Sequence, residues 1–211
     1  MILVGQYDSP FVRRVAITLQ LYDMPFARNA ISVFGDATAM ARINPLVRIP
    51  SLVLDEGEVL IESGAILDYL DERAGPGRAL TPRSGPERRQ VLQAMAVATG
   101  AIDKAGAIVY ERHFHAGPAV NQEWVARLRG QLNGGLAWLE ERLEGDWFFD
   151  GKLSQADITT AVLLFYLKLR LPEALEDRGT PRLERHSQRC EAMAAFIAAR
   201  PGADEIMPAR S

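Results

Sequence analysis

A serine near the start of the chain stands where a hydroxyl could act on a bound anion. Ser9 precedes Pro10, and this pair is typical of an N-cap followed by the first residue of a helix. A hydroxyl in that position lies in the positive field of the helix N-terminus and can donate a hydrogen bond to an anion bound there. If the anion is a thiolate, both effects lower the pKa of the thiol. A plain N-cap is the alternative role of this serine, and for a single serine it is the more common one.

A second segment, Asn44 to Leu52, places a proline immediately before an apolar stretch. Pro50 cannot donate a hydrogen bond to a β-ladder, so we expect it at the start of a strand. Arg48, two residues earlier, would be an ordinary solvated charge if this segment were only a loop. The sequence does not determine the isomer of the Ile49–Pro50 peptide bond.

A third segment, Glu62-Ser63, precedes a helical pattern. We expect Ser63 to cap that helix, so that its hydroxyl and the neighbouring backbone N–H groups suit a carboxylate. Glu62 could accept hydrogen bonds from an ammonium group. Together the two residues fit the carboxylate and ammonium of an α-amino acid, and an ordinary capped helix is the alternative.

The elements around these residues alternate between strands and helices. Residues 2–4 form a short buried-strand pattern, and apolar residues at helical spacing follow Pro10. Residues 26–33 weakly predict a second strand. The runs 51–54 and 58–61 flank Asp55-Glu56-Gly57, which indicates a hairpin. A short helix before the hairpin and a longer one after it complete a thioredoxin-like α/β arrangement, which we assign to residues 1–76.

The rest of the chain has a different pattern of apolar and helix-breaking residues. Residues 77–85 are rich in helix breakers and read as a linker. Residues 86–211 contain several amphipathic helical patterns and no convincing strand, so we predict an all-α helical-bundle C-terminal domain. Ser154 and Asp157 have the spacing of a capping box at the start of a nearly all-apolar helix, where we expect a structural role.

The composition excludes several classes of protein. The 211 residues carry a net charge of −3, without the basic excess that would indicate nucleic acid as a partner. The single cysteine, Cys190, cannot form an internal disulfide, which fits a reducing compartment, although a secreted protein without disulfides has the same feature. The first residues lack the pattern of a signal peptide, and no apolar run approaches the roughly 20 residues that span a membrane. We therefore expect a cytoplasmic protein with no membrane segment.

The order of the three segments, with an all-α domain behind them, resembles the cytosolic glutathione transferases. The resemblance covers the whole chain in layout. It rests on three motifs, which are similar to those of serine-type bacterial members of the family: Tyr7 to Val15, Asn44 to Pro50, and Glu62 to Ile66.

The resemblance implies a role for each of these residues toward glutathione. Ser9 matches the family serine that hydrogen-bonds and activates the glutathione sulfur. The remaining matches are Ile49 for backbone pairing with the cysteinyl unit, Pro50 for the cis-proline, Glu62 and Ser63 for the γ-glutamyl end and, more loosely, Arg48 for the glycine carboxylate.

Other residues are candidates for a second substrate or rivals of Ser9. Tyr7 is a rival because a phenol can also donate to a thiolate, but we rank Ser9 first because it occupies the N-cap. A cleft between the two domains would bind an apolar co-substrate, and each residue proposed to line it has a core position as its alternative. The candidates are Tyr7, Phe11, Tyr110, His113 and Phe114.

Three further expectations concern cofactors and partners. Glu111, His113 and His115 do not share one helical face and lack a firm third ligand, so we predict no metal site. Asp103 either contributes to the glutathione site of a partner subunit, as in some family members, or is a solvated charge. Cys190 reads as a small buried hydrophobe, and the absence of a cysteine near Ser9 argues against a disulfide reductase.

The expected activity is conjugation of the glutathione thiolate to an apolar electrophile, as in detoxification. The enzyme would position and ionise a nucleophile that arrives with the substrate. A glutathione-dependent isomerase, peroxidase or dehalogenase on the same fold is the first alternative. A non-catalytic binding module is the second, because fold does not imply function. The family resemblance also implies a homodimer.

Overall fold

The computed structural model describes residues 1–33, 35–115, 117–149, 151–176 and 179–206, and the chain divides into two compact units. The N-terminal unit contains Met1–Arg83 and the described part of Ala192–Met207. The helical unit contains the described part of Ser84–Glu191.

The N-terminal unit is built on a four-stranded sheet with the order β2-β1-β3-β4. Strand β1 pairs in parallel with β2 and antiparallel with β3, and β3 pairs antiparallel with β4. The second strand is shorter than expected, but the α/β thioredoxin-like prediction is confirmed. The strands are β1 (Ile2–Val4), β2 (Ala27–Asn29), β3 (Ser51–Val53) and β4 (Val59–Ile61).

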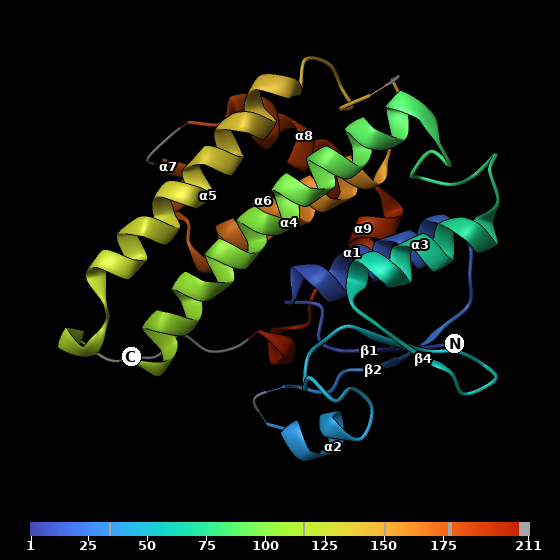
Figure 1. Cartoon of the computed structure of the whole chain (residues 1–211), viewed down its shortest axis with the longest axis horizontal. Helices are drawn as coiled ribbons and strands as arrows, with labels where there is room; N and C mark the ends of the chain where they lie inside the picture. Colours follow the sequence, from blue (N-terminus) through green and yellow to red (C-terminus); the bar gives the residue numbers. More distant parts are fainter. Residues whose placement is uncertain (34, 116, 150, 177–178, 207–211) are drawn as a thin grey trace. The chain divides into compact units, whose positions relative to one another are not determined.

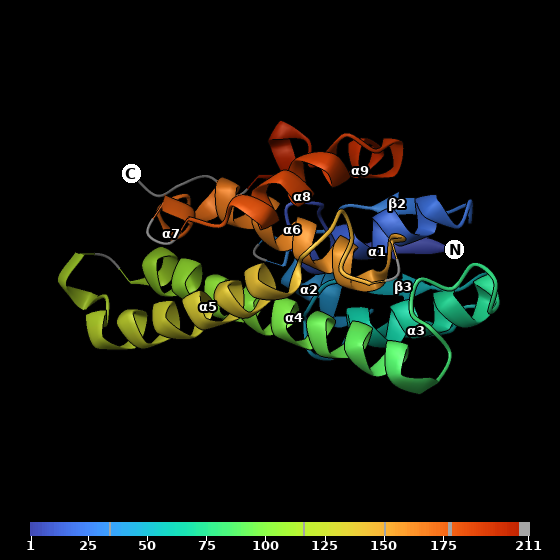
Figure 2. The ribbon, with the colours of Figure 1, turned by 90° about the horizontal axis from the view of Figure 1, so that it is seen from above.

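Helix α1 (Pro10–Leu21) is the central helix of this unit, because its apolar residues from Val12 to Leu19 are completely buried. It packs against α3 (Ser63–Ala74) and α9 (Ala194–Ala198), as Figures 1 and 2 show. The unit also contains α2 (Ala37–Ala41) and the 3₁₀ turn η2 (Ala203–Glu205).

The segment after Ala192 differs from the expected domain boundaries. We assigned residues 86–211 to the helical domain, but residues 192–206 group with the N-terminal unit. The physical reason is the side chain of Arg13, which is only 1% exposed on α1. Its Nε donates to the Ala199 carbonyl (3.0 Å) and its Nη2 to the Phe196 carbonyl (3.2 Å). A buried guanidinium needs such acceptors, and this segment supplies them.

The helical unit has no strand among its described elements apart from one isolated β-bridge, Phe149 with Lys152. Helix α6 is buried along most of its length, and α4, α7 and α8 pack against it, while α5 packs against α4 and α8. No described helix is both long and apolar enough to cross a membrane. The elements are α4 (Gly85–Phe114), η1 (Gly117–Ala119), α5 (Gln122–Arg142), α6 (Gln155–Arg170), α7 (Glu173–Glu176) and α8 (Pro181–Glu191).

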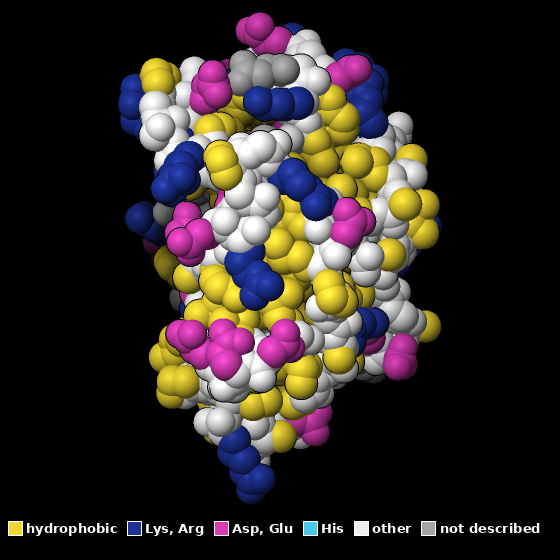
Figure 3. Space-filling view, turned by 90° about the vertical axis from the view of Figure 1, so that its right-hand side faces the viewer, with side chains coloured by type: hydrophobic (Ala, Val, Ile, Leu, Met, Phe, Trp, Pro, Cys, Tyr) yellow, Lys and Arg dark blue, Asp and Glu magenta, His cyan; other side chains and the backbone are white. Residues whose placement is uncertain are grey.

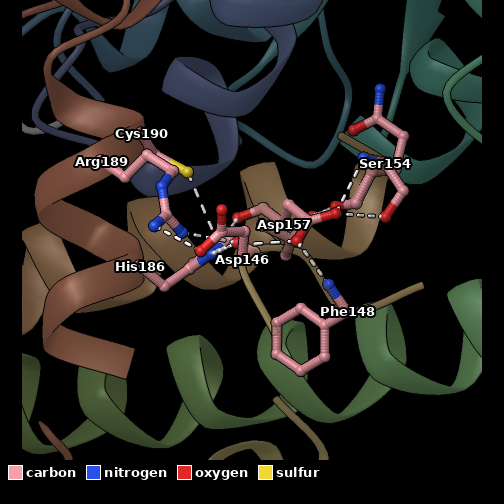
Figure 4. A network of polar contacts seen from close by, with 9 residues as sticks. Asp146, Phe148, Ser154, Asp157, His186, Arg189 and Cys190 are labelled. Carbon is pink, nitrogen blue, oxygen red and sulfur yellow. Dashed lines mark hydrogen bonds and ion pairs between the residues drawn. The ribbon is translucent and has the colours of Figure 1, made fainter. Parts of the chain in front are cut away.

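The expected capping box at the start of α6 is present. Figure 4 shows the fully buried carboxylate of Asp157 beside Ser154 and Phe148. Asp157 accepts hydrogen bonds from the Ser154 backbone N–H (2.8 Å), the Ser154 hydroxyl (2.6 Å) and the Phe148 N–H (3.0 Å). One carboxylate thus fixes both the helix start and the loop that precedes it.

The same cluster contains a histidine and the cysteine of the chain. His186 Nε2 lies 3.3 Å from the Asp157 carbonyl oxygen and 3.6 Å from Cys190 Sγ (Figure 4). A Cys–His–Asp grouping resembles nucleophilic machinery, but Cys190 is completely buried and burial raises the pKa of its thiol. Cys190 is therefore a structural residue, as the sequence indicated.

The charges on the surface are mixed in sign. Figure 3 shows Lys and Arg side chains spread over one face of the molecule among Asp, Glu and hydrophobic side chains. This distribution agrees with the near-neutral net charge of the sequence.

Replacing the central carboxylate of this cluster should destabilise the protein. Asp157→Ala leaves the buried N–H groups of Ser154 and Phe148 without their acceptor. Each unsatisfied buried group costs about 1–3 kcal/mol of stability. We expect the free energy of unfolding to fall by about 3 kcal/mol, which lowers Tm by roughly 6–12 °C in a chain of this size. Thermal unfolding followed by circular dichroism measures the change. Glu141→Ala, at an exposed position on α5, is the control and should be within about 0.5 kcal/mol of wild type. A wild-type Tm for Asp157→Ala would contradict this account.

Candidate functional site

Ser9 is the N-cap of α1, as its sequence context indicated. Strand β1 ends at Val4, and the turn Gln6–Ser9 is closed by the Ser9 N–H, which donates to the Gln6 carbonyl (3.2 Å). The half-buried Ser9 hydroxyl accepts a long hydrogen bond from the Val12 N–H (3.5 Å). Because the oxygen is the acceptor in this contact, its own proton can be donated to another group. The hydroxyl therefore lies at a positive helix end as a potential donor to an anion.

The Ile49–Pro50 segment lies directly beside this turn. The Ile49–Pro50 peptide bond is cis. Gly5, with φ +128°, allows the approach, because a Cβ at that position would lie 2.9 Å from Ile49 Cβ and 2.6 Å from Val12 Cγ2. Only glycine fits such a space without displacing its neighbours. The absence of one side chain thus brings the second sequence segment against the first.

Asn44 holds the loop that leads to this proline, a role that sequence reasoning missed. Its buried side-chain Nδ2 donates to the Arg48 carbonyl (2.8 Å), and its Oδ1 accepts from the Leu46 N–H (2.9 Å). The Arg48 side chain itself is exposed. The Asn-Pro sequence is a known turn signal, and it could have pointed to this role.

The Glu62-Ser63 pair differs from the expectation in one respect. Ser63 is the first residue of α3, and Glu62, with φ +70°, is the N-cap. The Ser63 side chain is 0% exposed, and its hydroxyl accepts from Arg14 Nη2 (2.8 Å) and donates to Glu62 Oε1 (3.2 Å). It therefore faces the protein. Glu62, Gly64 and Ala65 are the exposed residues at this helix end.

Arg14 is a further functional candidate that the sequence reading missed. Its guanidinium is buried, lies behind the start of α3 and has Cζ 5.9 Å from the centre of the Phe11 ring. A fixed positive charge there adds to the positive end of the α3 dipole, and both favour an anion. The signal in the sequence was an arginine pair inside an otherwise apolar helix.

Tyr7 is a core residue, the alternative that the sequence left open. Its side chain is 2% exposed and lies in the turn beyond β1, not on the strand. The Arg28 guanidinium covers its ring, with Cζ 3.5 Å from the ring centre. Burial raises the pKa of the phenol. These contacts make Tyr7 a poor rival of Ser9.

The remaining co-substrate candidates belong to different units of the chain. Phe11 is half-buried in the N-terminal unit. Tyr110 (46% exposed), His113 and Phe114 (57% exposed) form an aromatic cluster in the last turns of α4. The structure therefore brings these three together.

The candidates for other roles lie on α4 or at its C-cap, His115. Asp103 is exposed. His115 Nδ1 lies 3.2 Å from Glu111 Oε1. Within the described ranges, no group of three or more His, Cys, Asp or Glu side chains is arranged to hold a metal ion.

The comparisons with known proteins agree with this arrangement. The sequence model of the glutathione S-transferase N-terminal domain matches residues 3–79, and that of the C-terminal domain matches residues 122–189. Maleylacetoacetate isomerase of Pseudomonas aeruginosa is 31% identical over 99% of this chain and 100% of its own. An uncharacterised GST-like protein of Escherichia coli, YibF, is 30% identical over 81% of this chain and 83% of its own.

Solved structures of glutathione transferases are also similar to this chain. A glutathione S-transferase from Methylobacterium radiotolerans, in complex with glutathione sulfonate, has a TM-score of 0.89 at 28% identity and covers 100% of this chain and 99% of its own. A family member from Pseudomonas fluorescens with bound glutathione has a TM-score of 0.86 at 30% identity, with coverages of 96% and 99%. The two matched domains, the full-length relative and the site geometry lead to one conclusion: this chain belongs to the glutathione S-transferase family.

Proposed function

We propose that this protein is a glutathione transferase in which Ser9 stabilises the glutathione thiolate for attack on an apolar electrophile. The observation that carries the proposal is the half-buried Ser9 hydroxyl at the N-terminus of α1, in a family whose solved members include chains with bound glutathione. The hydroxyl would donate a hydrogen bond to the sulfur, and the helix field would favour its negative charge. Each unit by which the thiol pKa falls toward neutrality raises the thiolate fraction almost tenfold.

The protein supplies no sulfur nucleophile of its own in this proposal. Cys190 lies in the helical unit, is completely buried, and has a thiol whose pKa burial raises. The attacking sulfur therefore comes with the tripeptide, and catalysis consists of ionising and orienting it.

The rest of the N-terminal unit offers complementary groups for the tripeptide. The Ile49 backbone, next to the cis-Pro50, would pair with the cysteinyl unit. Glu62 would accept from the γ-glutamyl ammonium, and the first N–H groups of α3 would bind its carboxylate. Ser63 would act indirectly in this arrangement, because its hydroxyl is held by Arg14 and Glu62. The exposed Arg48 would pair with the glycine carboxylate.

A glutathione-dependent isomerase is the second candidate, and a specific observation favours it. The maleylacetoacetate isomerase of Pseudomonas aeruginosa aligns with this chain over its entire length. In such a reaction the thiolate adds to an activated double bond, the C–S bond forms and the π electrons move to the conjugated carbonyl. After rotation the C–S bond breaks and the thiolate leaves, so glutathione is regenerated.

Product analysis separates the candidates. A panel of aryl halides, cis-alkenyl ketones and peroxides is incubated with the protein and glutathione. Stoichiometric loss of thiol with thioether formation supports conjugation, and isomerised ketone without net loss of thiol supports the isomerase. Oxidised glutathione indicates a peroxidase. Glutathione binding without turnover on any substrate would favour a binding module.

The family resemblance extends the proposal to the assembly and location of the protein. We propose a homodimer that works in the cytoplasm. In that dimer Asp103, exposed on α4, is the candidate to reach the glutathione site of the partner subunit.

Removing the Ser9 hydroxyl should impair chemistry more than binding. Because Ser9→Ala loses the donor to the sulfur, we expect kcat at pH 7 to fall by about a hundredfold, the order measured when one donor to a developing anion is removed. The Kd of glutathione, measured by calorimetry, should change less than threefold. Ser84→Ala removes another serine that precedes a helix and should leave kcat unchanged. Wild-type turnover by Ser9→Ala would remove the assignment.

Neutralising Glu62 should weaken glutathione binding. Glu62→Gln loses a charge-assisted hydrogen bond to the ammonium, so we expect the Kd to rise by about tenfold or more. Glu58→Gln is a matched control, because it removes an exposed carboxylate of the hairpin in the same unit. Equal affinity of both variants for glutathione would show that Glu62 does not hold the ammonium.

A further inference from the structure

The last described part of the chain forms hydrogen bonds with residues that precede and follow Ser9 in the sequence. We call residues 192–206 the C-terminal clasp. It contacts Tyr7, two residues before Ser9, and Arg13, four residues after it. All of these residues belong to the N-terminal unit. The clasp is therefore in a position to fix the geometry of the turn that carries the hydroxyl.

Glu205 makes the contact on the Tyr7 side. Its side chain is 7% exposed, and its Oε1 accepts from the Tyr7 backbone N–H (3.1 Å) and from Arg28 Nη2 (2.5 Å). Its Oε2 accepts from the Gly202 N–H (2.9 Å) within the clasp. The buried carboxylate thus connects the clasp, β2 and the turn. Hydrogen bonds to a charged acceptor are stronger than those between neutral groups.

Arg28 strengthens the same connection. Its guanidinium pairs with Glu205 and lies over the Tyr7 ring, with Cζ 3.5 Å from the ring centre. A cation over an aromatic face is an attractive contact. Tyr7 is therefore held through its backbone by Glu205 and through its ring by Arg28. Since Tyr7 lies inside the four-residue turn that the Ser9 N–H closes, its position sets the path of the backbone to Ser9.

On the other side, the clasp fixes the first turns of α1. Arg13 donates to the carbonyls of Ala199 and Phe196 and is almost fully buried. The Arg13 N–H in turn donates to the Ser9 carbonyl (2.9 Å). The clasp thus limits movement of the helix start as well as of the turn before it.

We propose that Glu205 is a positioning residue that acts through Ser9, holding the Tyr7 N–H so that the Ser9 hydroxyl is aimed at the bound sulfur. This inference rests on the proposed function of Ser9. Without the carboxylate the Tyr7 N–H loses its buried acceptor and the turn relaxes. A displacement of about 1 Å of a catalytic group can cost about a hundredfold in rate.

The test compares Glu205→Ala with Glu205→Gln. Glutamine keeps an oxygen that accepts from the Tyr7 N–H, whereas alanine does not. For Glu205→Ala we expect the thiol pKa of bound glutathione, followed by thiolate absorbance, to rise by about one unit. The kcat at pH 7 should fall about tenfold and recover toward the wild-type value at higher pH. Glu205→Gln should stay within about threefold of wild type. Glu173→Ala removes the carboxylate that pairs with Arg112 and Arg129 in the helical unit and should leave the pH profile unchanged.

The double variant tests whether Glu205 acts through Ser9. Since Ser9→Ala already lacks the hydroxyl, adding Glu205→Ala should shift the thiol pKa no further. An additive shift would overturn the proposal, as would a wild-type pH profile for Glu205→Ala. If Ser9→Ala itself has a wild-type profile, the proposed function fails. If Ser9→Ala shifts the profile and Glu205→Ala does not, only the present inference fails.

Hydrogen exchange provides a readout that needs neither glutathione nor turnover. The Tyr7 amide should exchange at least tenfold faster in Glu205→Ala than in Glu205→Gln, with unchanged rates in α6. If Glu205→Ala does not fold, Glu205→Leu takes its place, because it removes the acceptor of the Tyr7 N–H but keeps a side chain of similar volume at this buried position. Unchanged Tyr7 exchange and an unchanged pH profile in the folded variant would overturn the proposal.

Discussion

The positive end of α1, with a serine hydroxyl at its cap, is the feature on which the rest of the N-terminal unit depends. A helix N-terminus attracts an anion within about one turn, so the hydroxyl is useful only if the turn before the helix is held at a fixed place. Three parts of the chain meet this requirement. Gly5 lets the Ile49–Pro50 segment approach, Glu205 fixes Tyr7, and Arg13 ties the start of α1 to the clasp.

Two neighbouring arginines show how one helix connects separate parts of the unit. Arg13 and Arg14 are both buried, although an arginine is among the residues least often found inside a protein. Each guanidinium is tolerated in the interior because hydrogen bonds to polar partners compensate for the loss of its hydration. Arg13 faces the carbonyls of the clasp, and Arg14 faces Ser63 at the start of α3. The first thus stabilises the position of α1, and the second places a positive charge where the proposed γ-glutamyl carboxylate would bind.

Local patterns in the sequence predicted most of the fold and the N-cap position of Ser9. The N-cap at Ser9, the hairpin after Pro50 and the capping box of Asp157 are set by residues within a few positions of one another, so a sequence read in order reveals them. The clasp was missed because its contacts join residues such as Arg13 and Ala199, 186 positions apart. The N-cap at Glu62 and the contact of Ser63 with Arg14 were missed for a related reason. Hydrophobic periodicity shows which helix face is buried, but it does not show that an arginine from another helix reaches the serine.

Conjugation and isomerisation would use the same groups of the N-terminal unit, and the reason is chemical. Both reactions begin with the same thiolate, so the groups that ionise and hold glutathione serve either one. They diverge after the C–S bond has formed. Conjugation needs a leaving group or a protonated adduct that is released, whereas isomerisation needs an adduct that rotates and then expels the sulfur. A strongly stabilised thiolate is the better leaving group, so the features that lower the thiol pKa also favour the reverse step. The choice therefore rests with the electrophile and with the residues that bind it. The exposed aromatic cluster at the end of α4 has apolar character that such a substrate would require.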